Sequence, residues 1–260
     1  MSGYKKLKLW FDEELGHKLA AKIEPLYSEF STDQFIKHIT QHIADQELKQ
    51  RVETIADGLH QQLPASYTNT CDIFHHILGP ENYNETGMFT EGYWLMPIAF
   101  YVEKYGVNHF NCSMKLIEEL TKRHTGEYAV RPFVQQYPNE TLMIAHKWAL
   151  SDNAHVRRLA SEGLRPRLPW AKKLVMFSDN PAPIIDVLEH LKSDSSAYVR
   201  KSVANNMADL LKENYDYAFK TLNKWSKTRS KETRWIIKHA LRNEVKKLNP
   251  HALSLLETEN

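Results

Sequence analysis

The sequence predicts an all-α protein made of antiparallel helix pairs that stack on one another. Its 260 residues include only 9 Gly and 11 Pro, fewer turn-forming residues than a β-sandwich or β-barrel requires. Apolar residues recur at helical spacing along most of the chain, and no alternating strand pattern competes with them. The second half also contains an internal repeat whose period is typical of stacked helix pairs.

The first half is predicted to form a succession of amphipathic helices. Segment 10–26 has Phe11, Leu15, Leu19 and Ile23 at helical spacing, and a second helix begins at about Thr32. A third helix is expected to follow the ELKQR motif of 47–51 and to end before the Leu-Pro pair of 63–64. Further helices are expected over 68–78, 92–104 and 111–123, whereas the Gly, Pro and Asn content of 79–91 predicts a loop.

The second half repeats a motif in which a polar cluster precedes a basic helix. SDNAHVRRLASEGL begins at Ser151 and SDSSAYVRKSVANNMADL begins at Ser193, and aligning their Val-Arg pairs gives an offset of 43 residues. A looser copy, SKETRWIIKHALRNEV, has its Arg234 34 residues after Arg200. The Ser, Asp and Asn clusters can cap helix N-termini. Each copy follows another apolar helix, expected over 140–150, 182–192 and 216–225.

Two helices per roughly 40 residues is the period of HEAT and armadillo repeats, which stack into solenoids with a concave face. We therefore expect a HEAT-like repeat solenoid and a single repeat domain over 1–260. Within it, 1–120 would form an N-terminal helical part, and 121–250 would form the basic repeats that carry the active site.

Composition excludes several other classes of protein. Two cysteines without CxxC spacing argue against a disulfide framework or a zinc finger. The N-terminus lacks the apolar segment of a signal peptide, and no apolar run approaches a membrane span, so we expect a cytoplasmic protein. No HExxH, GxxxxGK[ST], GxGxxG or GxSxG motif occurs, and we expect neither a metal site nor a nucleotide cofactor.

Charge is distributed unevenly along the chain. Residues 1–150 carry 14 Lys and Arg against 19 Asp and Glu, whereas 151–247 carry 20 against 11. A basic half favours a polyanion as ligand, although a solvated surface with surplus lysines is the plainer interpretation. If the repeated helices line one concave face, their cations lie one after another along it, as the phosphates of a nucleic-acid backbone do. The cations expected to bind DNA are Arg157, Arg158, Arg165, Arg167, Arg200, Lys201, Arg234 and Lys238.

Two carboxylates interrupt this basic surface. Arg158, Glu162 and Arg165 share a helix face, and this spacing alone favours an ion pair over a functional carboxylate. The repeat equivalent of Glu162 is Asn205, and Asp209 lies one turn beyond it, so Glu162 and Asp209 could approach each other across adjacent repeats. Such a pair can stabilise an oxocarbenium-like transition state at a sugar C1′, or position a water to attack it.

Two further residues have both a structural and a functional interpretation. Trp170 ends the RPRLPW motif, where Pro166 and Pro169 should end the helix and fix a turn. The usual role of tryptophan is a core anchor, and the functional alternative is an aromatic face for a cationic base or an exposed nucleotide. Glu127 lies in HTGEYAVRPF, directly after Gly126. The simplest interpretation is that its carboxylate lies at the start of a helix.

These motifs resemble the AlkC branch of the AlkC/AlkD superfamily of HEAT-like DNA glycosylases. The resemblance rests on HVRRLASEGLRPRLPW (155–170), SAYVRKSVANNMADL (196–210) and RWIIKHALRNEVKK (234–247). It extends to LKLWFDEEL near the start, to ELKQR and to LHQQLPASY (59–67), and so covers essentially the whole chain. The SEGLRPRLPW stretch is more specific than HEAT periodicity.

The resemblance implies a monofunctional bacterial DNA glycosylase that releases cationic N3-alkylated bases, such as 3-methyladenine and 3-methylcytosine, probing the duplex without base flipping. It implies that Glu162 is the catalytic glutamate and Asp209 an active-site aspartate. Glu127 would be a further acidic residue near the lesion, and Trp170 the aromatic beside it. We expect a monomer that binds double-stranded DNA, needs no cofactor and associates with the bacterial nucleoid when bound.

The sequence departs from some relatives in one respect. They carry an additional C-terminal immunoglobulin-like domain, which we do not expect in a sequence that ends at residue 260. Two other functions remain open at this point. The first is a non-catalytic HEAT-like protein that recognises distorted or branched DNA, and the second is a protein-scaffolding solenoid. The carboxylates within the basic groove favour the enzyme, because binding alone gains little from them.

Overall fold

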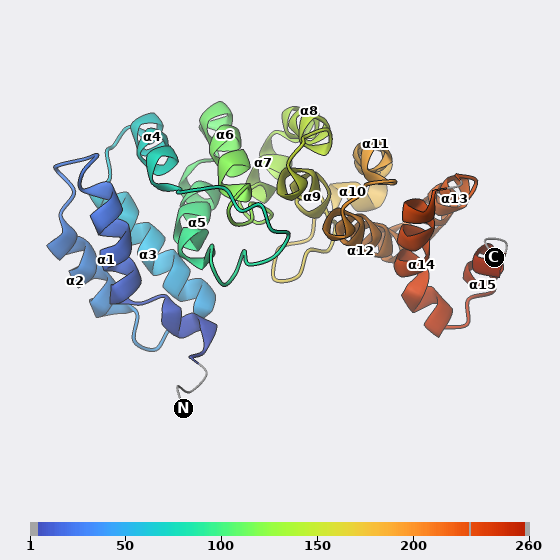
Figure 1. Ribbon diagram of the computed structural model, residues 1–260, viewed down its shortest axis with the longest axis horizontal. Coiled ribbons are helices and arrows are strands. Elements are labelled where there is room, and N and C mark those ends of the chain that lie inside the picture. The colour runs from blue at the N-terminus through green and yellow to red at the C-terminus, as the bar shows by residue number, and fades with distance from the viewer. Residues whose placement is uncertain (1–4, 229, 258–260) are drawn as a thin grey trace. The chain divides into compact units, whose positions relative to one another are not determined.

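The computed structural model describes residues 5–228 and 230–257, and every regular element within these ranges is a helix (Figure 1). The prediction of an all-α, HEAT-like fold is confirmed. No helix in the described ranges is long and apolar enough to cross a membrane. The chain divides into two compact units, Met1–Pro132 and Phe133–Asn260. Whether they act as the single expected repeat domain stays a prediction, and each unit is described by itself.

Unit 1 contains the helices expected in the first half of the chain and one unpredicted short helix, η1, at its start. They are η1 (Leu7–Trp10), α1 (Glu13–Ile23), α2 (Thr32–His42), α3 (Leu48–Gln62), α4 (Tyr67–Ile77), η2 (Tyr93–Leu95), α5 (Met96–Tyr105) and α6 (Phe110–Thr121). Helix α7 (Arg131–Gln136) crosses the boundary between the units. The segment predicted as a loop, 79–91, contains no helix, and Gly79 and Gly87 there adopt positive φ angles of 75° and 84°.

Two helix starts in unit 1 differ from the sequence prediction, for local reasons. Helix α1 begins at Glu13 because the Asp12 side chain accepts a hydrogen bond from Leu15 N and caps the first turn. Helix α3 begins within the ELKQR motif rather than after it. Glu47 and Gln50 there form a capping box, in which each side chain accepts from the other residue's backbone N–H.

Unit 2 contains the predicted repeats as three helix pairs. The pairs are α8 (Pro138–Ala149) with α9 (Ala154–Glu162), α11 (Ala182–Leu191) with α12 (Ala197–Glu213), and α13 (Tyr215–Ser226) with α14 (Lys231–Lys246). The short helices α10 (Met176–Asp179) and α15 (Pro250–Glu257) were not predicted, and neither was α7. The expected capping by polar clusters is confirmed, since Asn153, Ser196 and Ser230 each accept from a backbone N–H in the first turn of α9, α12 and α14.

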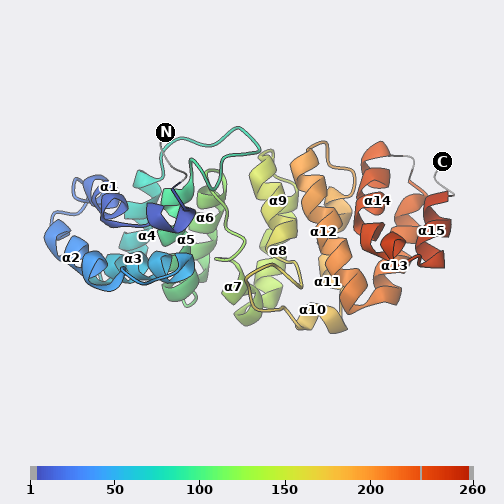
Figure 2. The same ribbon diagram turned by 90° about the horizontal axis from the view of Figure 1, so that it is seen from below.

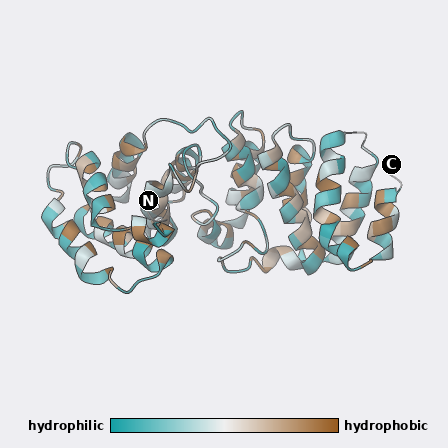
Figure 3. Cartoon of the chain, turned by 60° about the horizontal axis from the view of Figure 1, so that its bottom comes forward, coloured by the Kyte–Doolittle hydropathy of each residue, from teal (hydrophilic) through white to brown (hydrophobic). Residues whose placement is uncertain are grey.

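The second helices of the three pairs form one row in unit 2. Helix α12 packs against α9 on one side and α14 on the other, and Figure 2 shows the three in succession. Apolar residues face the junctions, among them Leu159 on α9, Met207 on α12 and Ile237 on α14, all fully buried or nearly so. Hydrophobic and hydrophilic residues alternate along the helices (Figure 3). This packing fixes which side chains of adjacent repeats meet.

Candidate active site

Glu162 is the last residue of α9, and its carboxylate is buried against α12. Arg165 Nη1 donates to its Oε1 at 2.7 Å, and Ser202 Oγ donates to its Oε2 at 2.6 Å. Arg158 Nη2 lies 3.6 Å from Oε1. The ion pair that the helical spacing predicted is therefore present. The carboxylate is held from both sides, by its own repeat and by the next.

Arg165 joins the two carboxylates. Its Nε donates to Asp209 Oδ2 at 2.8 Å, while its Nη1 binds Glu162. The expected approach of Glu162 and Asp209 across adjacent repeats thus occurs through one shared guanidinium. Helix α9 ends just before this bridge, with Gly163 as its C-cap and Pro166 beyond, so Arg165 leaves the helix and can reach α12.

The surroundings shift the two carboxyl pKa values in opposite directions. Burial alone would raise the pKa of Glu162, but Arg158, Arg165 and the Ser202 hydroxyl overcome it and hold that pKa below its ordinary value. Burial raises the pKa of Asp209. Arg165 and Lys212 offset this rise only in part, and the negative charge of Glu162 adds slightly to it. Opposite shifts are the pattern expected where two carboxylates take different roles.

Two residues of this site were missed by the sequence analysis. Ser202 binds Glu162, and Asn206 Nδ2 donates to the Ser161 carbonyl at 2.8 Å, which ties the end of α9 to α12. Both are buried, and with Asp209 they follow the i, i+4, i+7 spacing of one helix face. From this spacing, the sequence could have indicated that Ser202 and Asn206 share a helix face with Asp209. The spacing matches that of Arg158, Glu162 and Arg165 on the facing repeat.

Part of the acceptor capacity of the site is unused by the protein. Within residues 5–228 and 230–257, Asp209 Oδ1 accepts no hydrogen bond, and Glu162 Oε2 accepts only the one from Ser202. A carboxylate oxygen can accept two hydrogen bonds. The pair can therefore accept donors from water or from a substrate without breaking the bridge to Arg165.

Trp170 is not a core anchor. Its side chain is 87% exposed, and its backbone adopts a positive φ of 61° in the loop after α9. The residue before it is Pro169, and Ala171 N donates to Leu168 O, so the loop turns at this tryptophan. No hydrogen bond or ring contact joins the indole to any residue that the structure describes. Of the two interpretations of Trp170, the exposed aromatic face is the one that fits.

Glu127 belongs to unit 1 and is buried there, accepting a hydrogen bond from Thr125 Oγ1. The expectation that it starts a helix is wrong, since α7 begins four residues later at Arg131. It lies instead in a turn closed by the bonds from Val130 N to Gly126 O and from Arg131 N to Tyr128 O. Its proposed role near a lesion stays a prediction.

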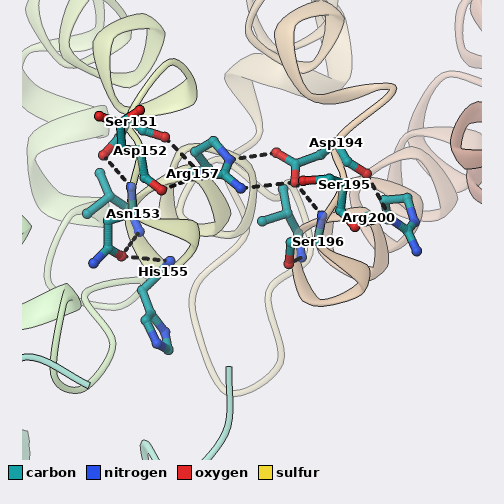
Figure 4. A network of polar contacts seen from close by, with 11 residues as sticks. Ser151, Asp152, Asn153, His155, Arg157, Asp194, Ser195, Ser196 and Arg200 are labelled. Atoms are coloured by element: carbon teal, nitrogen blue, oxygen red, sulfur yellow. Dashed lines mark hydrogen bonds and ion pairs between the residues drawn. The ribbon is translucent and has the colours of Figure 1, made fainter. Parts of the chain in front are cut away.

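The eight cations predicted to bind DNA form two groups, those that contact acceptors of the protein and those that are exposed. Arg157 and Arg200, which are equivalent in the repeat, are both engaged at repeat junctions (Figure 4). Arg157 Nε donates to Asp194 Oδ2 at 2.7 Å, and its Nη1 donates to two carbonyls of the preceding loop at 2.9 Å. Arg200 Nη1 donates to the carbonyls of Asp194 and Ser195 at 2.8 and 2.7 Å.

Three more of these cations have a carboxylate neighbour. Arg158 and Arg165 bind Glu162, and Arg167 Nη1 lies 3.3 Å from Glu213 Oε1. The remaining three, Lys201, Arg234 and Lys238, are exposed and have no ion-pair partner in the described part of the chain. Of the eight predicted cations, those without an ion-pair partner therefore lie on α12 and α14.

Comparisons with known proteins relate the chain to DNA alkylation repair enzymes. A family model described as DNA alkylation repair enzyme matches residues 123–243, a range that includes every predicted site residue. The uncharacterized protein YhaZ of Bacillus subtilis is 35% identical over 255 residues, which cover 98% of this chain and 69% of that protein. The solved structure of the Pseudomonas fluorescens alkylpurine DNA glycosylase AlkC, bound to DNA with an abasic site analogue, is 33% identical. It superposes with a TM-score of 0.87 over 98% of this chain and 69% of that one.

Proposed function

The chain belongs to the DNA alkylation repair enzyme family, in its AlkC branch, and on this premise we propose that it is a monofunctional DNA glycosylase. Its proposed substrates are cationic N3-alkylated bases in duplex DNA, 3-methyladenine and 3-methylcytosine. The observation that carries the proposal is the buried pair of carboxylates, Glu162 and Asp209, bridged by Arg165 within a mainly basic unit. A protein that only binds a polyanion gains nothing from buried negative charge.

The proposed chemistry is hydrolysis of the N-glycosidic bond. The C1′–N bond breaks and its electron pair goes to the base, which leaves as a neutral molecule because it was already a cation. A water oxygen forms the new bond to C1′, and its proton passes to a carboxylate. No general acid is needed for such a leaving group. Positive charge develops at C1′ in the transition state, and fixed negative charge stabilises it.

Two roles follow for the carboxylates. Glu162 is held by two hydrogen bonds, from Arg165 and Ser202, and by an ion pair with Arg158. Its pKa is lowered, so it suits a permanent negative charge near C1′. Asp209 keeps one oxygen without a donor among the residues that the structure describes, so it suits the orientation of water and the acceptance of its proton. Carboxylates also favour a cationic lesion over a neutral base, which provides selectivity without an enclosing pocket and thus without base flipping.

The other predicted residues support binding in this proposal. Trp170 offers an exposed indole for a cationic base, and a cation–π contact of this kind contributes roughly 0.5–2 kcal/mol. Glu127 would add negative charge near the lesion. Lys201, Arg234 and Lys238 would bind phosphates of double-stranded DNA, which makes the affinity depend on salt.

The test is single-turnover release of methylated bases from duplex DNA treated with a methylating agent. We expect wild type to release 3-methyladenine and 3-methylcytosine. Glu162→Gln and Asp209→Asn should each be slower by about 10²–10⁴-fold, the usual contribution of such groups. Glu189→Gln is the control, since Glu189 pairs with Lys192 and Lys224 away from the site.

Two results would contradict the proposal. Full activity in both carboxylate variants would refute the catalytic assignment. Binding of duplex DNA by wild type without release of any base would support the alternative, a non-catalytic HEAT-like protein that recognises distorted or branched DNA.

A further inference from the structure

The solvent face of α14 carries an aromatic residue among its cations. Arg234, Trp235, Lys238, His239 and Arg242 follow the i, i+1, i+4, i+5, i+8 spacing of one face. The opposite face supplies the buried core residues of the helix. Trp235 is 40% exposed, and so it contributes a large apolar surface to a basic face. Core packing of α14 does not account for it.

The Trp235 ring is held in place by its neighbours. His239 lies one turn along, with ring centroids 4.9 Å apart and planes only 6° from parallel. The guanidinium of Arg200, from α12, lies 5.8 Å from the ring centroid. Arg200 itself is fixed by the carbonyls of 194 and 195 (Figure 4). An aromatic side chain fixed in this way loses little conformational entropy when a ligand packs against it.

The charges around Trp235 indicate the kind of ligand. Arg234 and Lys238 flank it on α14, and Lys201 lies near His239, whose pKa is lowered by burial and by the charges of Arg242 and Lys201. None of Lys201, Arg234 and Lys238 has an ion-pair partner among the described residues. Unneutralised cations around an exposed indole match a chain of phosphates joined by apolar sugars and bases.

We infer that Trp235 contacts a nucleotide of bound DNA, in a nucleic-acid surface that it forms with Lys201, Arg234 and Lys238. The cations bind phosphates, and the indole packs against the deoxyribose or base between them. This surface is separate from the carboxylate pair, because it belongs to the α12–α14 junction rather than to α9–α12. The inference rests on the proposed function only in taking DNA as the ligand.

Fluorescence anisotropy with a labelled DNA duplex, at several salt concentrations, tests the inference. Trp235→Ala should weaken binding by about tenfold at every salt concentration and leave the slope of log Kd against log salt unchanged, because an aromatic contact releases no counterions. Lys238→Ala should reduce that slope by about 0.9. Tyr217→Ala, which removes a 38% exposed aromatic from α13, should bind as wild type does. Unchanged affinity of Trp235→Ala would overturn the inference.

A second variant keeps the test valid if Trp235→Ala fails to fold. Trp235→Phe preserves an aromatic ring, and thermal unfolding checks its stability. Among the six tryptophans, Trp235 should provide a measurable share of the fluorescence quenched by DNA, and Trp235→Phe should lose that share. Equal absolute quenching in both proteins would contradict a contact at Trp235. Binding and base release are measured separately, so a wild type that binds DNA without releasing bases would refute the glycosylase and leave this inference standing.

Discussion

The α9–α12 and α12–α14 junctions of unit 2 are built on one plan but differ in the polar residues that meet there. At the first, Glu162 meets Arg165 and Ser202. At the second, the equivalent residue is Asn205, whose Oδ1 accepts from Arg242 Nη2 at 2.9 Å. The two junctions share the same kind of helix caps and of apolar contacts between helices. At the second junction, by the same 43-residue offset, a neutral amide replaces the carboxylate of Glu162 and Ala208 replaces Arg165. This difference shows how a repeat protein can confine chemistry to a single junction.

The two junctions also differ in how they use arginine and lysine. The arginines beside α9 are bound to carbonyls and carboxylates of the protein, as Arg157 and Arg165 illustrate. On α14, Arg234 and Lys238 face solvent. We therefore assign the proposed catalysis to the first junction and most of the phosphate binding to the second. The predictions below test this division, from the largest expected effect to the smallest.

Removal of the bridging arginine should have the largest effect. Arg165→Ala leaves Glu162 and Asp209 buried without their shared partner, and we expect the free energy of unfolding to fall by about 3–5 kcal/mol. Arg242→Ala removes a bond to a neutral amide and should lower it by only about 1 kcal/mol. Urea unfolding of the two variants measures both values. Equal losses would contradict the distinction between the junctions.

Removal of the Ser202 hydroxyl should affect activity more than stability. Ser202→Ala takes from Glu162 a hydrogen bond that lowers its pKa, and such bonds to charged groups contribute roughly 1.5–3 kcal/mol. The pKa of Glu162 should rise, so the acidic limb of the pH–rate profile should move to higher pH. Ser202→Thr, which keeps the hydroxyl, should restore the wild-type profile. A slower variant with an unmoved profile would mean that Ser202 has only a structural role.

The two groups of cations should differ in the salt dependence of DNA binding. Arg234→Ala should lower the slope of log Kd against log salt by about 0.9, since one phosphate contact is lost. Arg157→Ala should leave the slope unchanged and instead destabilise the fold, because its guanidinium joins Asp194 to the loop before α9. A larger change of slope in Arg157→Ala than in Arg234→Ala would reverse our assignment of phosphate binding.

The smallest effect is expected at Lys212. Its positive charge lowers the pKa of Asp209, so Lys212→Met should raise that pKa further. If the Asp209 carboxylate must be ionised, activity is lost as pH falls through its pKa, and the variant should lose activity at a higher pH than wild type does. Lys212 is exposed, so the difference should vanish at high salt. A shift that persists at high salt would point to a change of structure instead.

The sequence was enough to predict the helices, the capped repeats and the meeting of Glu162 with Asp209, because periodicity and the 43-residue offset determine which faces adjoin. It could not predict which partner each long side chain selects. Arg157 and Arg234 look alike in sequence, yet one binds its own protein and the other faces solvent. Trp170 was assignable to core or surface only once the backbone of its loop was known.

The central claim is that the buried carboxylates perform chemistry while other residues hold the DNA. The most direct measurement compares Glu162→Gln with wild type in two assays, the single-turnover rate of 3-methyladenine release at saturating enzyme and the Kd for a duplex with an abasic site analogue. We predict a rate lower by at least about 10²-fold, with binding as tight as in wild type or tighter, because a negative charge near DNA has been removed. A wild-type rate, or a loss explained entirely by weaker binding, would contradict the account.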